Sequence, residues 1–203
     1  MKMQNVKKSL DRISKNLSSK LDSREYLLKK TREVNMLCSQ AIILIHKQEL
    51  VNSKKKIKKA HALLNKLAKR SSEDLRKYLS NSEQELVEAY ALTAAVDNKE
   101  IPSISTLKVS DEAYVLGLLD CIGELKRHVF EKIRKGNLDD ALRLFDMMEN
   151  LYQYLYPFAV YDKVVRETRR KLDVNRSLLE DVRAVITEES SRMDFVAFMK
   201  DKR

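Results

Sequence analysis

Apolar residues recur every three to four positions along most of the chain, which is the spacing of one face of an α-helix. The clearest run occupies residues 2–47 and predicts one long helix. Its apolar face is formed by Ile13, Leu17, Leu21, Leu27, Leu28, Val34, Leu37, Cys38, Ala41, Leu44 and Ile45. At 1.5 Å per residue this helix would be about 65–70 Å long, which is more than a small globule covers. We therefore expect a helix bundle, with the free end of this helix packed on another subunit.

The same spacing predicts six further helices, over residues 53–69, 71–96, 110–136, 137–156, 161–189 and 193–200. Ser110 stands directly before two acidic residues, which is typical of a helix N-terminus. Gly136 ends that helix, and Pro157 ends the next one. Residues 97–109 form the main loop. This loop is too short and ordinary to mark a domain boundary, so we expect one domain over 1–203.

Composition supports the helical interpretation. The 203 residues include only three Gly and two Pro, whereas a β-rich fold needs a turn signal every 8–12 residues or so. Hydrophobic residues make up 43% of the chain, enough for a substantial core. The expected fold class is therefore all-α.

Positive charge is concentrated in the first third of the chain. Residues 1–70 hold 19 Lys and Arg against 5 Asp and Glu, whereas the whole chain has a net charge of +10. This asymmetry suggests a polyanionic partner that contacts the first third. A solvated lysine face that only keeps the protein soluble explains the same numbers.

Cysteine usage and apolar run lengths favour a cytoplasmic protein without a membrane segment. Cys38 and Cys121 lie in apolar helical runs and have no metal-binding spacing, so we expect small buried side chains in a reducing compartment. The first eight residues lack the apolar core of a signal peptide. Apolar stretches such as Ala41–Ile45 are far shorter than the roughly 18 residues that span a membrane.

Two pairs of acids interrupt segments that are otherwise apolar. Glu85 and Glu88 are three residues apart, and Asp120 and Glu124 are four apart, so each pair shares one helix face. Gly117 lies one turn before Asp120, where a mid-helix glycine permits close approach of a backbone or a ligand; a second glycine, at position 123, adjoins Glu124.

A carboxylate surrounded by apolar side chains is costly unless a cation or a hydrogen-bond donor contacts it. If the four acids converge, repulsion and burial raise their pKa values, and a divalent cation relieves that penalty. Oxygen ligands suit Mg²⁺ or Mn²⁺. The alternative is a set of structural ion pairs, for which Lys126, Arg127 and the lysines of 53–69 are available.

Other candidate chemistry is sparse. The three histidines, His46, His61 and His128, have no ligand spacing and are interpreted as structural or surface residues. No nucleotide-binding glycine pattern, hydrolase elbow or di-iron Glu-x-x-His pattern occurs. An aromatic group is open to two interpretations, base stacking or packing around the break at Pro157; its members are Tyr152, Tyr154, Tyr156, Phe158 and Tyr161.

The acidic segments resemble the translin family. Residues 114–127 read YVLGLLDCIGELKR and are similar to the YxxGVxDLxGELxR segment of the translin-associated factor X branch. Residues 84–89, QELVEA, are similar to the QEYVEA segment of that branch. The helix 24–46, the Gly136 turn and the helix 161–186 also fit, so the resemblance covers roughly residues 20–190.

This resemblance implies a seven-helix bundle of the translin type that assembles into octameric shells and binds single-stranded RNA or DNA. Its catalytic branch is a Mg²⁺-dependent endoribonuclease. The metal carboxylates of that branch fall on Glu85, Glu88 and Asp120, and the acid one turn later falls on Glu124, which implies a catalytic role for all four.

The RNA-contacting segment of the family matches residues 53–70 only loosely. The cations available there are Lys54, Lys55, Lys56, Lys58, Lys59, Lys66, Lys69 and Arg70. The chain departs from the animal proteins because it has no long basic N-terminal tail and its 97–109 loop is short. A compact chain of this kind suggests a self-sufficient homo-oligomer, of archaeal type, that needs no separate translin partner.

Three functions therefore remain open at the level of sequence. The first is a Mg²⁺-dependent endoribonuclease acting on single-stranded RNA. The second is a shell that binds single-stranded RNA or DNA without cutting it. The third is a structural bundle whose acids are neutralised by Lys or Arg; the basic first third disfavours this option.

Overall fold

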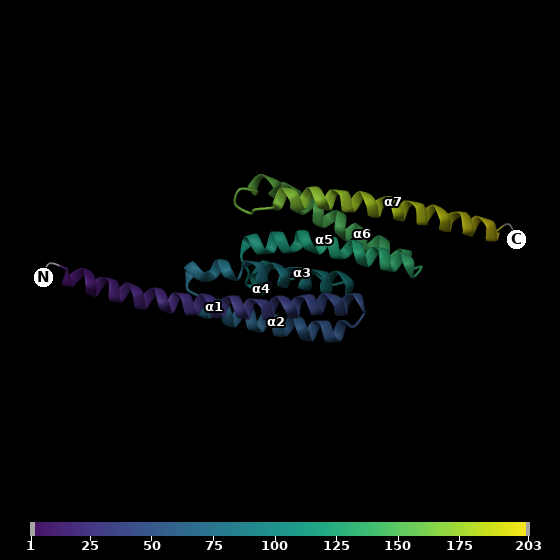
Figure 1. Cartoon of the computed structure of the whole chain (residues 1–203). Coiled ribbons are helices and arrows are strands. Elements are labelled where there is room, and N and C mark those ends of the chain that lie inside the picture. Colours follow the sequence, from purple (N-terminus) through teal and green to yellow (C-terminus); the bar gives the residue numbers. More distant parts are fainter. Residues whose placement is uncertain (1–2, 202–203) are drawn as a thin grey trace.

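Helices account for all regular elements of residues 3–201, which are the residues that the computed structural model describes (Figure 1). They are α1 (Gln4–His46), α2 (Leu50–Arg70), the 3₁₀ helix η1 (Glu73–Tyr78), α3 (Ser80–Val96), α4 (Ile104–Leu107), α5 (Asp111–Arg134), α6 (Leu138–Leu155), the 3₁₀ helix η2 (Tyr156–Tyr161) and α7 (Thr168–Asp201). The all-α expectation and the long first helix are confirmed; Lys2, its expected first residue, lies outside the described residues.

Four element boundaries differ from the sequence prediction. The segment before α3 is the separate 3₁₀ helix η1, and the 97–109 loop contains the short helix α4. The sixth expected helix begins at Thr168, since residues 156–161 form η2 and Glu167 has a left-handed φ of 74°. No break occurs near 190, because Arg192 pairs with Glu188 and Glu189 at 3.1 Å and α7 continues through the two serines between them.

Helices α3 and α5 form the centre of the bundle and lie side by side (Figure 1). Helix α1 packs on α3, with α2 outside it, whereas α6 and α7 pack on α5. Large side chains that are almost fully buried between α3, α5 and α6 include Leu86, Leu92, Leu119, Ile122, Leu125, Leu144 and Met148. Burial of each such side chain stabilises the fold by about 1.5–3 kcal/mol. This packing holds the two acidic segments, on α3 and α5, in place.

A glycine sets the spacing between α3 and α5. A Cβ atom on Gly117 would lie 2.6 Å from the carbonyl oxygen of Gln84 and 2.6 Å from Cβ of Val87. The close approach expected at this glycine is therefore present. Gly123 is different, because its Cβ would have Leu178 Cδ1 at 3.9 Å as its nearest neighbour, which is ordinary contact.

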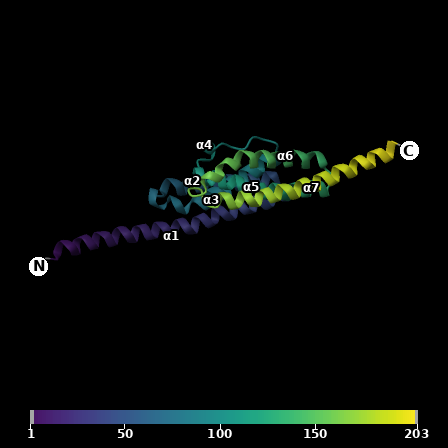
Figure 2. The same ribbon diagram turned by 90° about the horizontal axis from the view of Figure 1, so that it is seen from above.

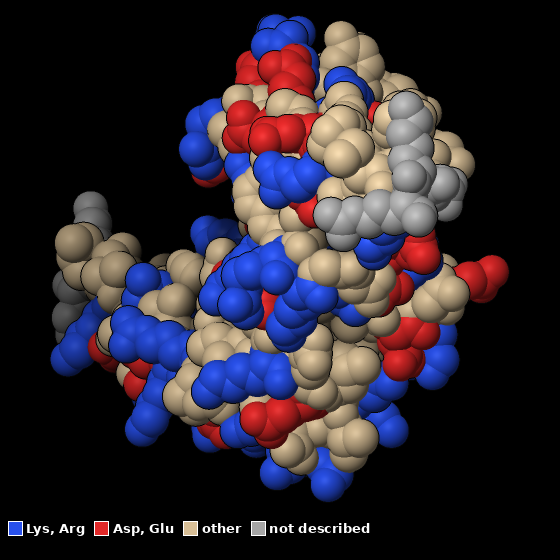
Figure 3. Space-filling view, turned by 90° about the vertical axis from the view of Figure 1, so that its right-hand side faces the viewer, with Lys and Arg blue, Asp and Glu red and all other residues tan. Residues whose placement is uncertain are grey.

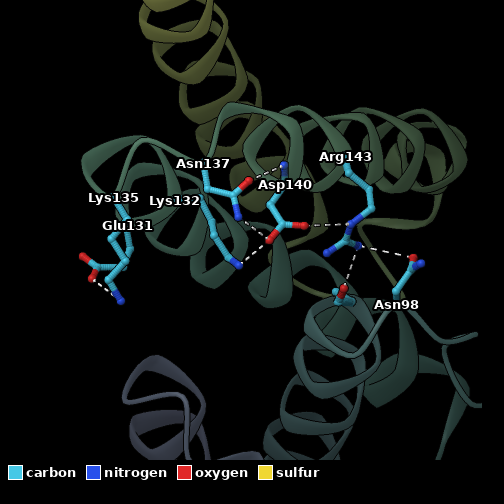
Figure 4. A network of polar contacts seen from close by, with 8 residues as sticks. Asn98, Glu131, Lys132, Lys135, Asn137, Asp140 and Arg143 are labelled. Atoms are coloured by element: carbon cyan, nitrogen blue, oxygen red, sulfur yellow. Dashed lines mark hydrogen bonds and ion pairs between the residues drawn. The ribbon is translucent and has the colours of Figure 1, made fainter.

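Polar contacts fix the turn between α5 and α6 (Figure 4). Asn137 caps α6 by accepting a hydrogen bond from the backbone N–H of Asp140. Lys132 Nζ lies 2.5 Å from the Asp140 carboxylate. Arg143 donates to the carbonyl oxygen of Ala95 at 2.9 Å and so ties α6 to the end of α3, which stabilises the packing of α6 over the central helices.

Both ends of the chain extend beyond the bundle as single helices (Figures 1 and 2). The first part of α1 carries apolar side chains that are 45–69% exposed: Met3, Val6, Leu10, Ile13, Leu17 and Leu21. The last turns of α7 carry a second exposed set, with Phe195 62% and Phe198 52% exposed. Surfaces of this kind on a helix outside the core are typical of sites that contact another molecule.

Two further expectations concern the cysteines and the membrane. Cys38 and Cys121 are fully buried and unpaired, as expected of small core side chains. Across residues 3–201 no helix is long and apolar enough to cross a membrane. Instead, Lys and Arg gather with Asp and Glu on the end face of the bundle in Figure 3.

Candidate active site

The four predicted acids lie close together on neighbouring faces of two adjacent helices. Glu85 and Glu88 lie on α3, Asp120 and Glu124 lie on the neighbouring α5, and all four are half-buried. Helix α7 flanks these faces on one side and α1 on the other, because Lys171 reaches Asp120 and His46 reaches Glu124. We call these four residues the acidic cluster.

Glu88 is the electrostatic centre of the cluster. Burial, and then the carboxylates of Asp120, Glu85 and Glu124, raise the pKa of Glu88 to about 8. Burial and the Asp120 carboxylate also raise the pKa of Glu85. Among the described residues no side chain makes a hydrogen bond or ion pair with either of these two carboxylates. The charge of Lys171 lowers the pKa of both, but by less than burial and the neighbouring acids raise it.

Asp120 has two partners. Gln84 Nε2 donates a hydrogen bond to Oδ2 at 2.5 Å, and the ammonium group of Lys171 pairs with Oδ1. Asp120 and Lys171 also line a cleft of about 210 Å³ between α5 and α7, together with Arg170 and Asn175. The Asp120 carboxylate is therefore accessible from solvent and balanced by one lysine.

Glu124 is held by a histidine pair. His46 Nε2 lies 2.5 Å from Glu124 Oε2, and since a carboxylate accepts, the imidazole donates there. On the other side of the ring, His46 Nδ1 and His128 Nδ1 lie 3.2 Å apart, and which of them donates depends on the tautomers of the two rings. The hydrogen bond from His46 lowers the pKa of Glu124, whereas burial and then His46 lower the pKa of His128 to about 4. Glu124 is consequently ionised beside a neutral His128.

These contacts bear on the expected metal site. Within residues 3–201, no three His, Cys, Asp or Glu side chains are grouped as a ready-made ligand set. The oxygen donors of the cluster suit Mg²⁺ or Mn²⁺ chemically, and Glu85 and Glu88 are without partners. However, the Asp120 carboxylate contacts Lys171, and the Glu124 carboxylate contacts His46. A metal ion that binds Asp120 would therefore have to displace Lys171.

The sequence predicted that the four acids lie together, but it did not predict the residues that contact them. Gln84, Lys171, His46 and His128 complete the site, and His46 had been interpreted as structural or surface. Lys171 and His46 are 51 and 78 residues from the acids that they contact, so no local spacing could reveal them. Gln84 was visible, because it precedes Glu85 and lies one helical turn before Glu88 on the same face.

The cations expected to contact RNA lie along α2. Lys55, Lys58, Lys59, Lys66 and Lys69 are exposed and, in the described part of the chain, form no ion pair. Three others are engaged: Lys54 pairs with Asp97 at 2.8 Å, Lys56 donates to Gln40 at 2.6 Å, and Arg70 lies over the ring of Tyr26. Helix α2 lies on the opposite side of the bundle from α7 (Figure 1), so these lysines form a surface apart from the acidic cluster.

The remaining histidine and the aromatic group have distinct roles. His61 is structural, as expected, since its ring contacts the Tyr90 hydroxyl and the Leu107 carbonyl at 3.0 Å.

The aromatic group is largely exposed, with Tyr154 74% and Tyr156 60% exposed. Packing around Pro157 therefore accounts for only part of this group.

Comparisons with known proteins identify the family. The translin family profile matches residues 22–188. An uncharacterized protein of Methanocaldococcus jannaschii is 39% identical over 173 residues, which are 81% of this chain and 75% of that protein.

Solved structures agree in fold. The structure of AfC3PO in complex with duplex RNA has a TM-score of 0.83 at 30% identity and covers 91% of this chain and 97% of its own. The crystal structure of AfC3PO gives a TM-score of 0.84 at 30% identity, with 91% and 98% covered. The apo-NeC3PO structure, at 21% identity, gives 0.78 with 89% and 96% covered and shares the fold. The chain belongs to the translin family.

Proposed function

We propose that this protein binds RNA and is a Mg²⁺-dependent endoribonuclease that cuts single-stranded RNA at the acidic cluster. The observation that carries the proposal is the convergence of Glu85, Glu88, Asp120 and Glu124 around one wall, where the pKa of Glu88 is raised to about 8. Two of these acids have no cation partner, which is costly for the free protein and is relieved by a divalent cation. The similarity of both acidic segments to the catalytic branch of the family points the same way.

Glu85, Glu88 and Asp120 would hold the ion, with Mn²⁺ as a substitute for Mg²⁺. When bound, Mg²⁺ would supply Lewis-acid chemistry, making water a better nucleophile and offsetting charge on the phosphate. The residues of the chain supply the rest. Glu124, ionised by its contact with His46, accepts a proton, and Lys171, released from Asp120, places a positive charge beside the phosphate.

RNA as the ligand is supported by charge and by a relative. AfC3PO has been crystallised with duplex RNA, and the first 70 residues of this chain carry a large excess of Lys and Arg. Exposed lysines along α2 would attract a strand through its phosphates, and single-stranded DNA offers the same charge. We also propose that the protein works as a homo-oligomer, an octamer in keeping with its family, and in the cytoplasm, where buried unpaired cysteines stay reduced.

A decisive experiment follows labelled single-stranded RNA with the purified protein, with and without Mg²⁺, and with EDTA. Cleavage should need Mg²⁺ and should be lost in Glu85→Gln and Asp120→Asn variants, which keep side-chain size. Glu180→Gln, on the exposed face of α7, is the matched control and should cut normally. Full activity of the Asp120→Asn protein would overturn the catalytic assignment.

A second function, RNA binding without catalysis, is favoured by one observation. Asp120 is paired with Lys171, and Glu124 with His46, which is the arrangement of structural ion pairs. A protein of this type should retain RNA that is released as salt rises, and it should cut none at any Mg²⁺ or Mn²⁺ concentration. Absence of RNA binding near physiological salt would exclude both functions.

A further inference from the structure

A cleft of about 730 Å³ is lined by residues from the end of the bundle where α3 and α5 begin. Four cations from three separate segments line it. Arg76 and Lys77 come from η1, Lys108 from the turn before α5, and Arg166 from the turn before α7. None of these positions was singled out by the sequence, since each is an ordinary surface cation in its own segment. We call this the η1 cleft.

The cations of the η1 cleft have no acidic partner. Within residues 3–201 their side chains make no ion pair, and Lys77 only lies over the ring of Tyr78 at 5.4 Å. Other basic residues of this protein are paired, as Lys126 is with Asp181 at 2.7 Å. Four exposed cations facing one hollow raise its positive potential, which is relieved when an anion binds there.

The acids of the cleft do not remove this charge. Glu83 Oε2 accepts hydrogen bonds from the Ser110 backbone N–H at 3.0 Å and from its hydroxyl at 2.7 Å. That carboxylate is thus committed to the N-terminus of α5. Glu112 lies in the first turn of α5, where the helix dipole favours an acid. Four cations against two acids leave the η1 cleft positive.

Two helical rows of residues run from the η1 cleft toward the acidic cluster. On α5, Glu112, Leu116 and Asp120 follow one another at intervals of four residues, so they form one row along the helix. On α3, Ser80, Gln84 and Glu88 form a parallel row.

The two rows lie side by side, because Gln84 bonds Asp120. Eight residues of α5 separate the cleft from Asp120, which is about 12 Å. A polyanion lying in the cleft therefore reaches the cluster within a few nucleotides.

We infer that the η1 cleft binds the phosphates of the RNA strand next to the phosphodiester that is cut, and so sets where the strand enters the active site. This inference rests on the proposed function and assigns it a second surface, apart from the lysines of α2. Guanidinium groups contact phosphate through two parallel N–H donors, and lysine adds a point charge.

The test removes two cations from the cleft and two from elsewhere. The variant Lys108→Asn/Arg166→Ala deletes charges of the cleft; asparagine is chosen because Lys108 has a left-handed φ of 57°, which asparagine tolerates. The control Lys47→Asn/Arg134→Ala deletes the same charges at the opposite end of the bundle. All four residues are exposed, and circular dichroism verifies that both proteins fold.

Binding of a labelled single-stranded RNA is measured by fluorescence anisotropy in EDTA, so that no cleavage is required. The cleft variant should bind at least about tenfold more weakly, and the slope of log Kd against log salt should fall by roughly 1.4, from two lost phosphate contacts. The control should change Kd by less than about threefold. With Mg²⁺, the cleft variant should raise KM for cleavage more than it lowers kcat.

The two proposals fail in different ways. If the cleft variant and the control bind RNA equally to wild type, the cleft inference is overturned while RNA binding and cleavage stand. If wild-type protein binds RNA and both double variants weaken it equally, the contribution is general charge, and the cleft is again excluded. If the wild-type protein retains no RNA, the proposed function and the cleft inference fall together.

Discussion

The backbone of α3 passes so close to Gly117 that a Cβ atom there would lie 2.6 Å from the carbonyl oxygen of Gln84. Gln84 in turn donates to Asp120, so this contact fixes the distance between the two acidic segments. A side chain at position 117 would push α3 and α5 apart at the point where the acids converge.

We expect Gly117→Ala to destabilise the protein by about 1–3 kcal/mol, because the overlap involves backbone and a β-branched side chain that cannot yield freely. Gly123→Ala is the matched control on the same helix. Its Cβ has space, and the better helix propensity of alanine should stabilise by up to about 1 kcal/mol. Urea unfolding followed by circular dichroism measures both; equal stability of the two variants would contradict the close-packing argument.

The raised pKa of Glu88 makes stability depend on pH. The folded state holds a proton on Glu88 up to about pH 8, whereas the unfolded state releases it near the ordinary glutamate pKa of 4.5. Through Glu88 the folded chain thus binds more protons between these values, and the contribution of Glu88 to the free energy of unfolding should fall as pH rises from about 4.5 to 8. His128, whose pKa is lowered to about 4, has the opposite effect below pH 6.5.

Glu88→Gln should abolish most of this slope and stabilise the metal-free protein at pH 8.5 by about 2–4 kcal/mol. Urea titrations in EDTA at pH 5, 6.5 and 8.5 provide the measurement. Glu180→Gln, an exposed carboxylate on α7, should leave the slope unchanged. A Glu88→Gln protein with the same pH dependence as wild type would show that Glu88 is compensated in a way the structure lacks.

Lys171 and a metal ion compete for the carboxylate of Asp120. Lys171→Met keeps the length of the side chain and removes its charge, so we expect Mg²⁺ to bind several-fold more tightly, as followed by the midpoint of thermal stabilisation against Mg²⁺ concentration. Lys126→Met removes a similarly buried ammonium group, paired with Asp181, and should have no such effect. Weaker Mg²⁺ binding in Lys171→Met would mean that the ion does not use Asp120.

The sequence predicted the helices well where apolar periodicity is long and unambiguous, as in α1, α2 and α5. The prediction failed for short elements and helix ends, which depend on the contacts of a few residues. Four residues, Ile104–Leu107, form α4 because Leu107 is buried, and no periodic pattern exists over so short a segment. The pattern predicted a break between residues 189 and 193, yet ion pairs from Arg192 to Glu188 and Glu189 lie within one continuous helix.

In the candidate site, too, the sequence revealed local spacing but not contacts between residues far apart in the chain. The acids were found because each pair occupies a local helical spacing inside an apolar run. Their charge balance depends on Lys171 and His46, which come from helices that only the tertiary fold brings to the cluster. The cations of the η1 cleft were missed for the same reason, since Arg76 and Arg166 are 90 residues apart in the chain.

His46 controls the protonation of Glu124. Because the hydrogen bond from His46 lowers the pKa of Glu124 while burial raises it, removing the imidazole should raise that pKa. If Glu124 accepts a proton in cleavage, the acid limb of the kcat profile should move to higher pH in His46→Ala. His61→Ala, whose ring contacts Tyr90 and not the acids, should leave the limb in place. An unshifted profile in His46→Ala would remove Glu124 from the proton-transfer step.

The exposed apolar row on the first part of α1 predicts self-association through that helix. Val6, Leu10, Ile13 and Leu17 are 45–59% exposed and follow one another at intervals of four, three and four residues, which is the seam of a helix–helix contact. Leu10→Glu/Leu17→Glu should therefore lower the mass of the assembly in sedimentation velocity without loss of helix content. Lys8→Glu/Lys15→Glu makes a comparable addition of acid away from that row and should assemble normally, because its side chains are outside the seam. An unchanged mass in the leucine variant would show that another surface, such as the exposed end of α7, holds the copies together.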